Sequence, residues 1–85
     1  MIIHIELMAL IKRPNSLPRV FSKEFNRELV VRTLLKDLGF SSREIRFLQV
    51  FISRDDRKPD AKRVSRSYPL KDHDKVFITM PIGGG

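Results

Sequence analysis

The chain has 85 residues, which is enough for one small domain and too few for a second. Hydrophobic residues make up 41% and charged residues 32%, as in a folded globular domain, and the absence of cysteine excludes disulfides, thiolate metal sites and cysteine nucleophiles. The net charge of +7 would attract an acidic partner or a polyanion, but the basic residues are spread along the chain without interleaved aromatic residues, so nucleic acid is the less favoured partner.

The apolar start of the chain is not a membrane segment. Residues 1–11 carry His4 and Glu6 and are too few to span a bilayer. They also lack the basic start and the small-residue cleavage site of a signal peptide. We therefore expect a soluble cytoplasmic protein without a membrane partner.

Two strands joined by a loop are predicted next. Residues 2–11 alternate between two faces. The fully apolar face consists of Ile3, Ile5, Leu7, Ala9 and Ile11. Loop 12–18 contains Pro14 and Pro18, which favour a turn, and residues 19–25 are a second strand. Two strands with a short connection predict a hairpin.

An amphipathic helix is predicted over residues 27–38. Asn26 is a favourable N-cap, and Glu28 places a carboxylate in the first turn, where it suits the helix dipole. The apolar residues at helical spacing are Val30, Val31, Leu34, Leu35 and Leu38. Gly39 stands where a helix commonly ends in the left-handed conformation, and Phe40 is expected to fold back onto the helix.

The second half of the chain predicts further strands. Residues 45–53 are rich in Phe, Ile and Val and follow a short connection, and the basic stretch 53–67 is a long loop with a short strand around Val64. Residues 70–75 are a turn, and residues 76–80 are the last strand. This order predicts a two-layer α+β domain in which one helix covers one face of the sheet.

Three of the four glycines are Gly83, Gly84 and Gly85. Glycine loses the most backbone entropy on ordering and has no side chain to bury, so this triplet contributes almost nothing to stability. A thin extended segment can instead enter a narrow channel of another protein. We therefore divide the chain into a domain, residues 1–81, and a flexible tail, residues 82–85.

The closing stretch also resembles a known family. Residues 68–85 read YPLKDHDKVFITMPIGGG, and they are similar to the end of the ubiquitin-like sulfur carriers, which include the small subunit of molybdopterin synthase and the thiamine-biosynthesis sulfur carrier. That family typically shows Leu-Lys-Asp-Gly-Asp, a hydrophobic strand, an exit with proline and a final Gly-Gly. His73 stands here in place of the family glycine, so we expect it to take a positive φ. The connection 53–67 is longer and more basic than the usual one.

The resemblance implies a β-grasp fold, in which a mixed four- to five-stranded sheet packs on one helix. It also implies that a ubiquitin-activating-like adenylyltransferase, using ATP and Mg²⁺, adenylates the Gly85 carboxylate, which then becomes a thiocarboxylate. The tail residues Pro81, Ile82, Gly83 and Gly84 would enter the active site of that partner. The chain itself would bind no cofactor or metal and would be a carrier, not an enzyme.

The sulfur acceptor implied by the resemblance is an enzyme such as the large subunit of molybdopterin synthase, because the length favours the molybdopterin type over the shorter thiamine type. Two alternatives remain open. A ubiquitin-like modifier joined to lysines needs the same tail, and a basic β-grasp RNA-binding module would use loop 53–67.

A docking surface is predicted on the last strand. If Val76 and Ile78 face the helix, Phe77 points away from it, and exposed aromatic residues are good anchors for a partner. Phe47 and Phe51 are the candidate neighbours of Phe77 on this surface. In the alternative interpretation, Phe77 only packs against one of them.

Overall fold

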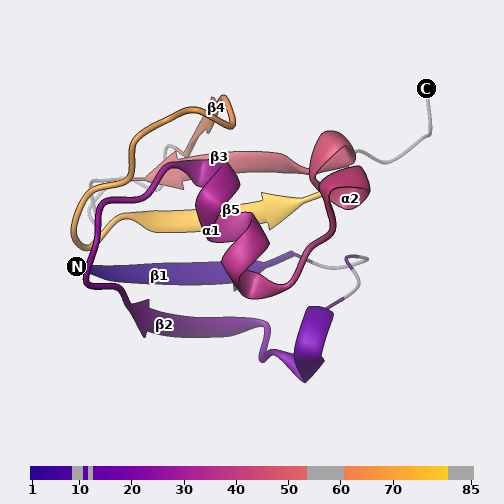
Figure 1. The fold of residues 1–85 in the computed structure, drawn as a ribbon, viewed down its shortest axis with the longest axis horizontal. Coiled ribbons are helices and arrows are strands. Elements are labelled where there is room, and N and C mark those ends of the chain that lie inside the picture. The colour runs from indigo at the N-terminus through magenta and orange to yellow at the C-terminus, as the bar shows by residue number, and fades with distance from the viewer. Residues whose placement is uncertain (9–10, 12, 54–60, 81–85) are drawn as a thin grey trace.

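The computed structural model describes residues 1–8, 11, 13–53 and 61–80. Over these ranges the chain is an α+β domain with one mixed five-stranded sheet and two α-helices (Figure 1). The strands are β1 (Ile2–Leu7), β2 (Val20–Glu24), β3 (Gln49–Ser53), β4 (Lys62–Val64) and β5 (Lys75–Thr79). The helices are α1 (Val31–Leu38) and α2 (Ser42–Phe47), with a short 3-10 turn at Pro14–Ser16.

The last strand lies in the middle of the sheet. The strand order is β2-β1-β5-β3-β4, in which β1 and β5 are parallel and the other neighbours are antiparallel. β5 therefore forms hydrogen bonds on both sides, with β1 and with β3. The short strand predicted around Val64 is confirmed as β4, at one edge of the sheet.

The core lies between the sheet and α1, which crosses one face of it (Figure 1). Alternation places every second strand residue on this inner face, and the buried members are almost wholly aliphatic. From the strands they are Ile3, Ile5, Leu7, Val50, Ile52, Val76 and Ile78. From α1 they are Val31, Leu34, Leu35 and Leu38, so the predicted helical stripe is confirmed except at its first residue.

The start of the helix was predicted wrongly. α1 begins at Val31 and not at residue 27, and its N-cap is Val30, whose side chain forms no capping hydrogen bond, in place of Asn26. Val30 is instead extended and forms a β-bridge with Pro69. The N–H of Val31 donates to the Tyr68 carbonyl at 3.0 Å. A distant segment therefore binds a backbone donor of the first turn that has no partner within the helix.

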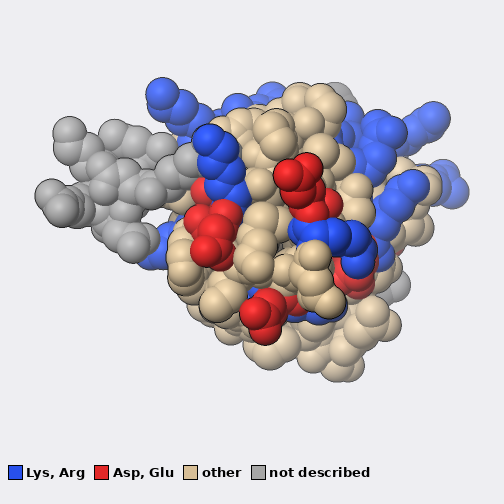
Figure 2. All heavy atoms as spheres, turned by 60° about the vertical axis from the view of Figure 1, so that its left-hand side comes forward, with Lys and Arg blue, Asp and Glu red and all other residues tan. Residues whose placement is uncertain are grey.

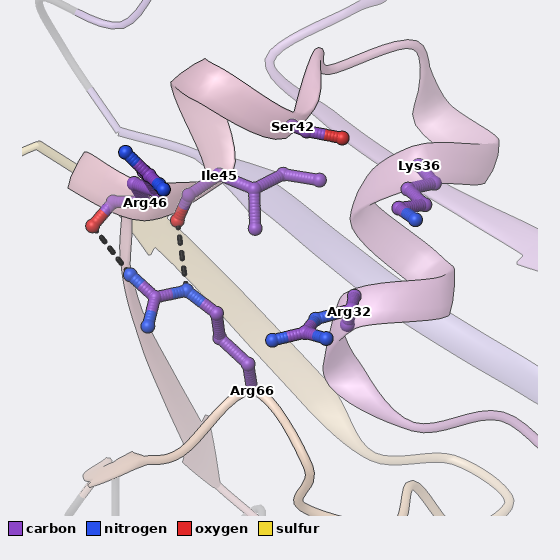
Figure 3. Close-up of a pocket in the computed structure, with 6 residues that line it drawn as sticks. All are labelled: Arg32, Lys36, Ser42, Ile45, Arg46 and Arg66. Atoms are coloured by element: carbon purple, nitrogen blue, oxygen red, sulfur yellow. Dashed lines mark hydrogen bonds between the residues drawn. The ribbon is translucent and has the colours of Figure 1, made fainter.

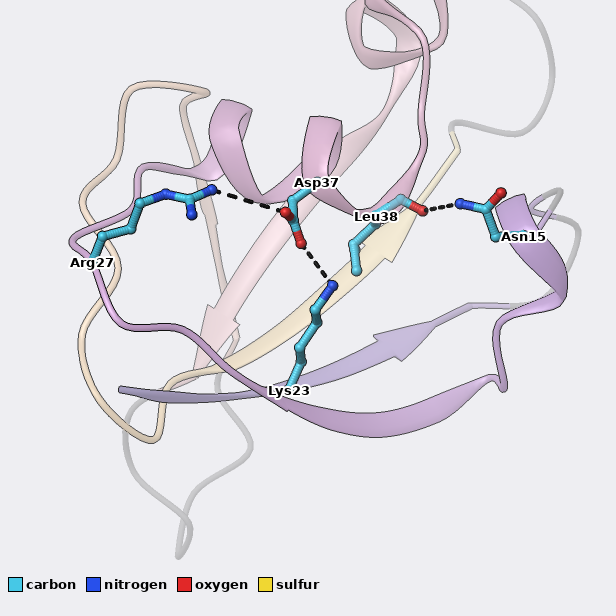
Figure 4. Close-up of polar contacts among 5 residues, drawn as sticks. All are labelled: Asn15, Lys23, Arg27, Asp37 and Leu38. Atoms are coloured by element: carbon cyan, nitrogen blue, oxygen red, sulfur yellow. Dashed lines mark hydrogen bonds and ion pairs between the residues drawn. The ribbon is translucent and has the colours of Figure 1, made fainter.

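The end of the helix agrees with the prediction. Gly39 has φ 111 in the left-handed region, and Phe40 is buried against the core. The Asn15 side chain donates to the Leu38 carbonyl at 3.3 Å (Figure 4). A Cβ at Gly39 would lie 2.5 Å from Asn15 Nδ2, so both backbone conformation and space require glycine there.

Ion pairs join the exposed side of α1 to the edge of the sheet. Asp37 accepts from Lys23 at 2.8 Å and lies 3.8 Å from Arg27 (Figure 4). All three side chains reach solvent, so each pair contributes little to stability. The Asp37 carboxylate nevertheless lies between two cations and partly compensates the positive charge of Lys23 and Arg27.

A second helix replaces the start of a predicted strand. Residues 45–47 belong to α2 and not to the strand 45–53, which begins only at Gln49 as β3. Ser41 and Glu44 form a capping box, with Glu44 N–H donating to Ser41 Oγ at 3.1 Å and Ser41 N–H donating to the Glu44 carboxylate at 2.8 Å. The expectation of a single helix on the sheet is therefore wrong, because this local signal outweighs the β-propensity of Ile45 and Phe47.

The first strand is also shorter than predicted. β1 ends at Leu7 instead of residue 11, and Met8 donates its N–H to the Ile78 carbonyl of β5 at 2.9 Å. Ile11 is buried, as expected for the apolar face, although it lies outside the strand. Residues 9, 10 and 12 lie outside the described ranges.

The turn before β5 ties the two parallel strands together. His73 has φ 66, as predicted for the position of the family glycine, and its N–H donates to the Ile2 carbonyl at 2.7 Å. Asp72 accepts from the Ile2 N–H at 2.6 Å. Asp74 is buried and accepts from the Lys71 N–H at 2.8 Å, which closes the turn. The turn thus fixes the start of β5 against the start of β1.

Within the described ranges, neither helix has the length and apolar character needed to cross a membrane.

Candidate functional site

The end of β5 is where the described chain leaves the sheet. Thr79 is the last residue of β5 and pairs with Gln49, the first residue of β3. On the other side, Ile78 pairs with Leu7 and accepts from the Met8 N–H. Met80 follows and is 40% exposed. Hydrogen bonds to two neighbouring strands therefore fix the position from which residues 81–85 continue.

Exposed apolar side chains gather around this end of the sheet. Among the described residues, the large apolar side chains with exposed surface are Met8, Val20, Phe47 and Met80. Met8 follows the end of β1, which is parallel to β5, and Val20 begins the antiparallel strand β2 at the same end. Phe47 ends α2, which lies beside the end of β5 (Figure 1). Solvent-exposed apolar groups clustered in this way are typical of an interaction surface.

The outer face of the sheet continues this surface. The register aligns one residue from each strand in a single row across all five strands, and in strand order the row is Val20, Glu6, Phe77, Phe51 and Arg63. A hollow of about 450 Å³ runs along β2, β1 and β5, with Phe77 and Val20 among its lining residues. The outer face thus carries the aromatic residues Phe77 and Phe51 between a carboxylate at Glu6 and a cation at Arg63.

The structure divides the three aromatic candidates into a pair and a separate residue. Val76 and Ile78 are buried on the inner face, so the prediction that Phe77 points away from α1 is confirmed. Phe51 is its direct antiparallel neighbour, and both are half-buried. Phe47 is 60% exposed and belongs to α2 instead of the sheet. Phe51 and Phe77 therefore lie side by side on the outer face, whereas Phe47 lies at the end of the sheet.

A polar cluster lies at the opposite end of the outer face. His4 contacts Ser22 Oγ through Nδ1 at 2.7 Å and His73 Nδ1 through Nε2 at 3.3 Å, with the two imidazole rings stacked 5.5 Å apart. The Ile2 N–H, followed by the weaker influence of His73, holds the pKa of Asp72 below its ordinary 3.8 against the opposing effect of desolvation. Within the described ranges no three His, Asp or Glu side chains are placed to hold a metal.

The predicted reactive residues lie outside the described ranges. These are Pro81, Ile82, Gly83, Gly84 and Gly85. The structure places only the strand that leads to them and the surface around its end.

Sequence reasoning missed two parts of this site. Met8 and Val20 join the exposed apolar group only because β1 stops at Leu7 and because β2 pairs with it in a particular register. Neither position carries a local signal for exposure, since alternation alone assigned Met8 to a continuing strand. The contact between His4 and His73 joins residues 69 positions apart and depends on the parallel pairing of β1 and β5.

Comparison of the chain with models of known families, with curated proteins and with solved structures finds no match.

Proposed function

We propose that the chain is a ubiquitin-like sulfur carrier with a β-grasp fold that serves molybdopterin synthesis. The observation that carries this proposal is the strand order β2-β1-β5-β3-β4 with β1 parallel to β5, which is the arrangement expected for a β-grasp. In this arrangement the last strand is the central one. The glycine segment then continues from the middle of the sheet instead of from a loose edge.

The reacting group in this proposal is the Gly85 carboxylate. One of its oxygens attacks the α-phosphorus of ATP, and pyrophosphate leaves, so that an acyl-adenylate forms. Hydrosulfide then attacks the carbonyl carbon, AMP leaves, and a thiocarboxylate remains. The activating partner supplies the ATP site, Mg²⁺ and the catalytic groups. This chain supplies the carboxylate and the surface by which the partner recognises it.

The apolar groups around the end of β5 support a role in recognition. A partner that takes residues 81–85 into a channel must also contact the surface at the channel's mouth. Met80, Met8 and Phe47 are exposed at that place, and Phe77 lies further along the outer face. Large apolar and aromatic side chains of this kind contribute most of the binding free energy at interfaces. The acceptor, which we propose is the large subunit of molybdopterin synthase, would use the same end.

The experiment is a mass measurement on the intact chain. The protein is incubated with a ubiquitin-activating-like adenylyltransferase of its host, ATP, Mg²⁺ and sulfide. The expected product is heavier by the difference between one sulfur and one oxygen atom, and a variant without Gly84 and Gly85 gains nothing while keeping its fold, because a terminal segment of glycines buries little surface.

Two results would contradict the proposal. An unchanged mass with every activating enzyme of this class from the host would overturn it. A ladder of heavier conjugates on purification from cells, without any thiocarboxylate, would instead assign the chain to the protein modifiers.

A further inference from the structure

A pocket of about 320 Å³ lies on the helical side of the molecule, between α1, α2 and the turn after β4 (Figure 3). Its lining residues within the described ranges are mainly cations, and none of them is acidic. The lining residues are Arg32, Lys36, Ser42, Ile45, Arg46 and Arg66. We call this site the cationic pocket.

Arg66 builds one wall of the cationic pocket. Its Nε donates to the Ile45 carbonyl at 3.0 Å, and a second guanidinium nitrogen donates to the Arg46 carbonyl, so the side chain is fixed at the end of α2. Its own carbonyl accepts from the Arg32 N–H at 2.9 Å in the first turn of α1. Carbonyl groups satisfy the donors of a guanidinium but carry no net charge. The Arg66 side chain is therefore held in place and keeps its full positive charge.

Among the described residues, Arg32 and Lys36 have no acidic partner. Arg32 and Lys36 lie one turn apart on α1, so they belong to the same side of the helix. No described residue forms an ion pair with either of them, whereas Lys23 and Arg27 share Asp37. Figure 2 shows acidic side chains near the middle of the visible face with Lys and Arg beside them, and further Lys and Arg projecting from its upper and right-hand rim. Positive charges collected without a counter-charge favour binding of an anion.

Arg32 and Ser42 direct polar groups into the cationic pocket, whereas the Arg46 guanidinium points away from α1 (Figure 3). Arg32 extends toward Arg66, and the Ser42 hydroxyl points toward α1 (Figure 3). Ile45 lies between the two helices and is almost fully buried, so it forms an apolar floor. A guanidinium can bind a carboxylate through two parallel hydrogen bonds, and an ammonium and a hydroxyl can each donate one more. These donors match one or two carboxylates.

We propose that the cationic pocket binds acidic side chains of a partner protein. A nucleic acid is less well matched, because no aromatic side chain lines the pocket for base stacking. By contrast, Lys23 of β2 and Arg27 before α1 are paired with Asp37. This proposal does not depend on the sulfur-carrier function, because it uses the helical side and neither residues 81–85 nor the outer face.

The experiment measures binding of an oligoglutamate peptide to the full chain. Backbone amide signals of Ser42, Ile45 and Arg32 should shift on titration. Arg32→Gln combined with Lys36→Gln should weaken binding by about tenfold or more, which corresponds to about 1.4 kcal/mol. The matched control combines Lys23→Gln with Arg27→Gln, which removes the same charge from paired cations, and should leave the affinity nearly unchanged.

Several outcomes would overturn the proposal. Equal losses in the two double variants would show that only the overall charge matters. Tighter binding of a uridine oligonucleotide of equal charge would assign the pocket to nucleic acid, and equally tight binding of inorganic phosphate would reduce it to a simple anion site. If the first double variant is unfolded by circular dichroism, Lys36→Gln alone decides. Lys36 is exposed and forms no ion pair with a described residue, so its substitution should weaken binding without a change in fold.

Discussion

The two faces of the sheet are made by the same five strands, yet they have different compositions and roles. The inner face is aliphatic and closed by α1, and most of its side chains are almost wholly buried. The outer face mixes His4, Glu6, Phe51 and Phe77, none of which is fully buried. Because inner residues are constrained by packing on every side, the fold depends on them. The outer residues are constrained less, so they are the ones available for binding.

The largest expected effect is a truncation on the inner side. Leu34 is fully buried in α1, so Leu34→Ala should lower the free energy of unfolding by about 2–5 kcal/mol. Urea denaturation measures this loss. Glu6→Ala on the outer face is the control and should change stability by less than about 1 kcal/mol. Equal losses at the two positions would contradict the division into a structural and a binding face.

A truncation of the outer aromatic pair should affect binding more than folding. Phe77 is half-buried, so Phe77→Ala should cost about 1–2 kcal/mol of stability, well below the 3–5 kcal/mol of a fully buried phenylalanine. The affinity of the Phe77→Ala variant for the activating adenylyltransferase should fall by about tenfold or more. Calorimetric titration measures the affinity, and Glu24→Ala, at an exposed position at the opposite end of the sheet, serves as a control that should leave it unchanged. An unchanged affinity would remove Phe77 from the docking surface.

The next prediction concerns Gly39, which ends α1 in the left-handed conformation and lies close to Asn15. Gly39→Ala should destabilise the protein by about 1–2 kcal/mol, since the new Cβ meets Asn15 and the backbone is left-handed. In an Asn15→Gly background the same substitution should cost less, because the closest contact of the new Cβ is removed and only the backbone strain and the approach to Pro14 Cβ at 3.1 Å remain. A double-mutant cycle by urea denaturation separates the two causes. Strict additivity would show that contact with Asn15 is unimportant.

The smallest expected effect concerns acid stability at the turn before β5. The folded-state pKa of Asp72 is lowered, chiefly by the Ile2 N–H, so its ionised form stabilises the fold. This contribution is complete above the unfolded pKa, near 3.8, and is lost as the pH falls through the lower folded pKa. Asp72→Asn should therefore be less stable than the natural chain at neutral pH, and the difference should narrow below pH 3.8.

The control for this prediction is Glu28→Gln, which removes an exposed carboxylate elsewhere. Thermal unfolding followed over a range of pH compares the two variants. If the difference in stability between Asp72→Asn and the natural chain widens as the pH falls, the ionised form of Asp72 does not stabilise the fold.

Local signals in the sequence predicted much of the fold. Gly39 ended the helix where it should, His73 took the positive φ expected of its turn, and all five strands lie within or close to their predicted ranges. α2 also had a local signal, the Ser41–Glu44 capping box, which was overlooked because the neighbouring apolar residues favour a strand. The start of α1 had none, since Val31 is held by the Tyr68 carbonyl.

The candidate site was less predictable for the same reason. Phe77 could be assigned to the outer face from alternation alone. The cationic pocket could not be predicted, because Arg32, Arg46 and Arg66 come together only through the packing of two helices and a turn. The composition gives the sign of the net charge, but it does not show where on the surface positive side chains lack an acidic neighbour.

The parallel pairing of β1 with the central β5 also determines how the domain resists force. Met1 stands at one end of β1, and Met80 leaves β5 at the other end. A pull between these points loads the hydrogen bonds of the two strands together, in shear, instead of opening them one at a time as peeling would. An enzyme that pulls on the chain after Met80 would therefore meet mechanical resistance where β5 ends, at Thr79.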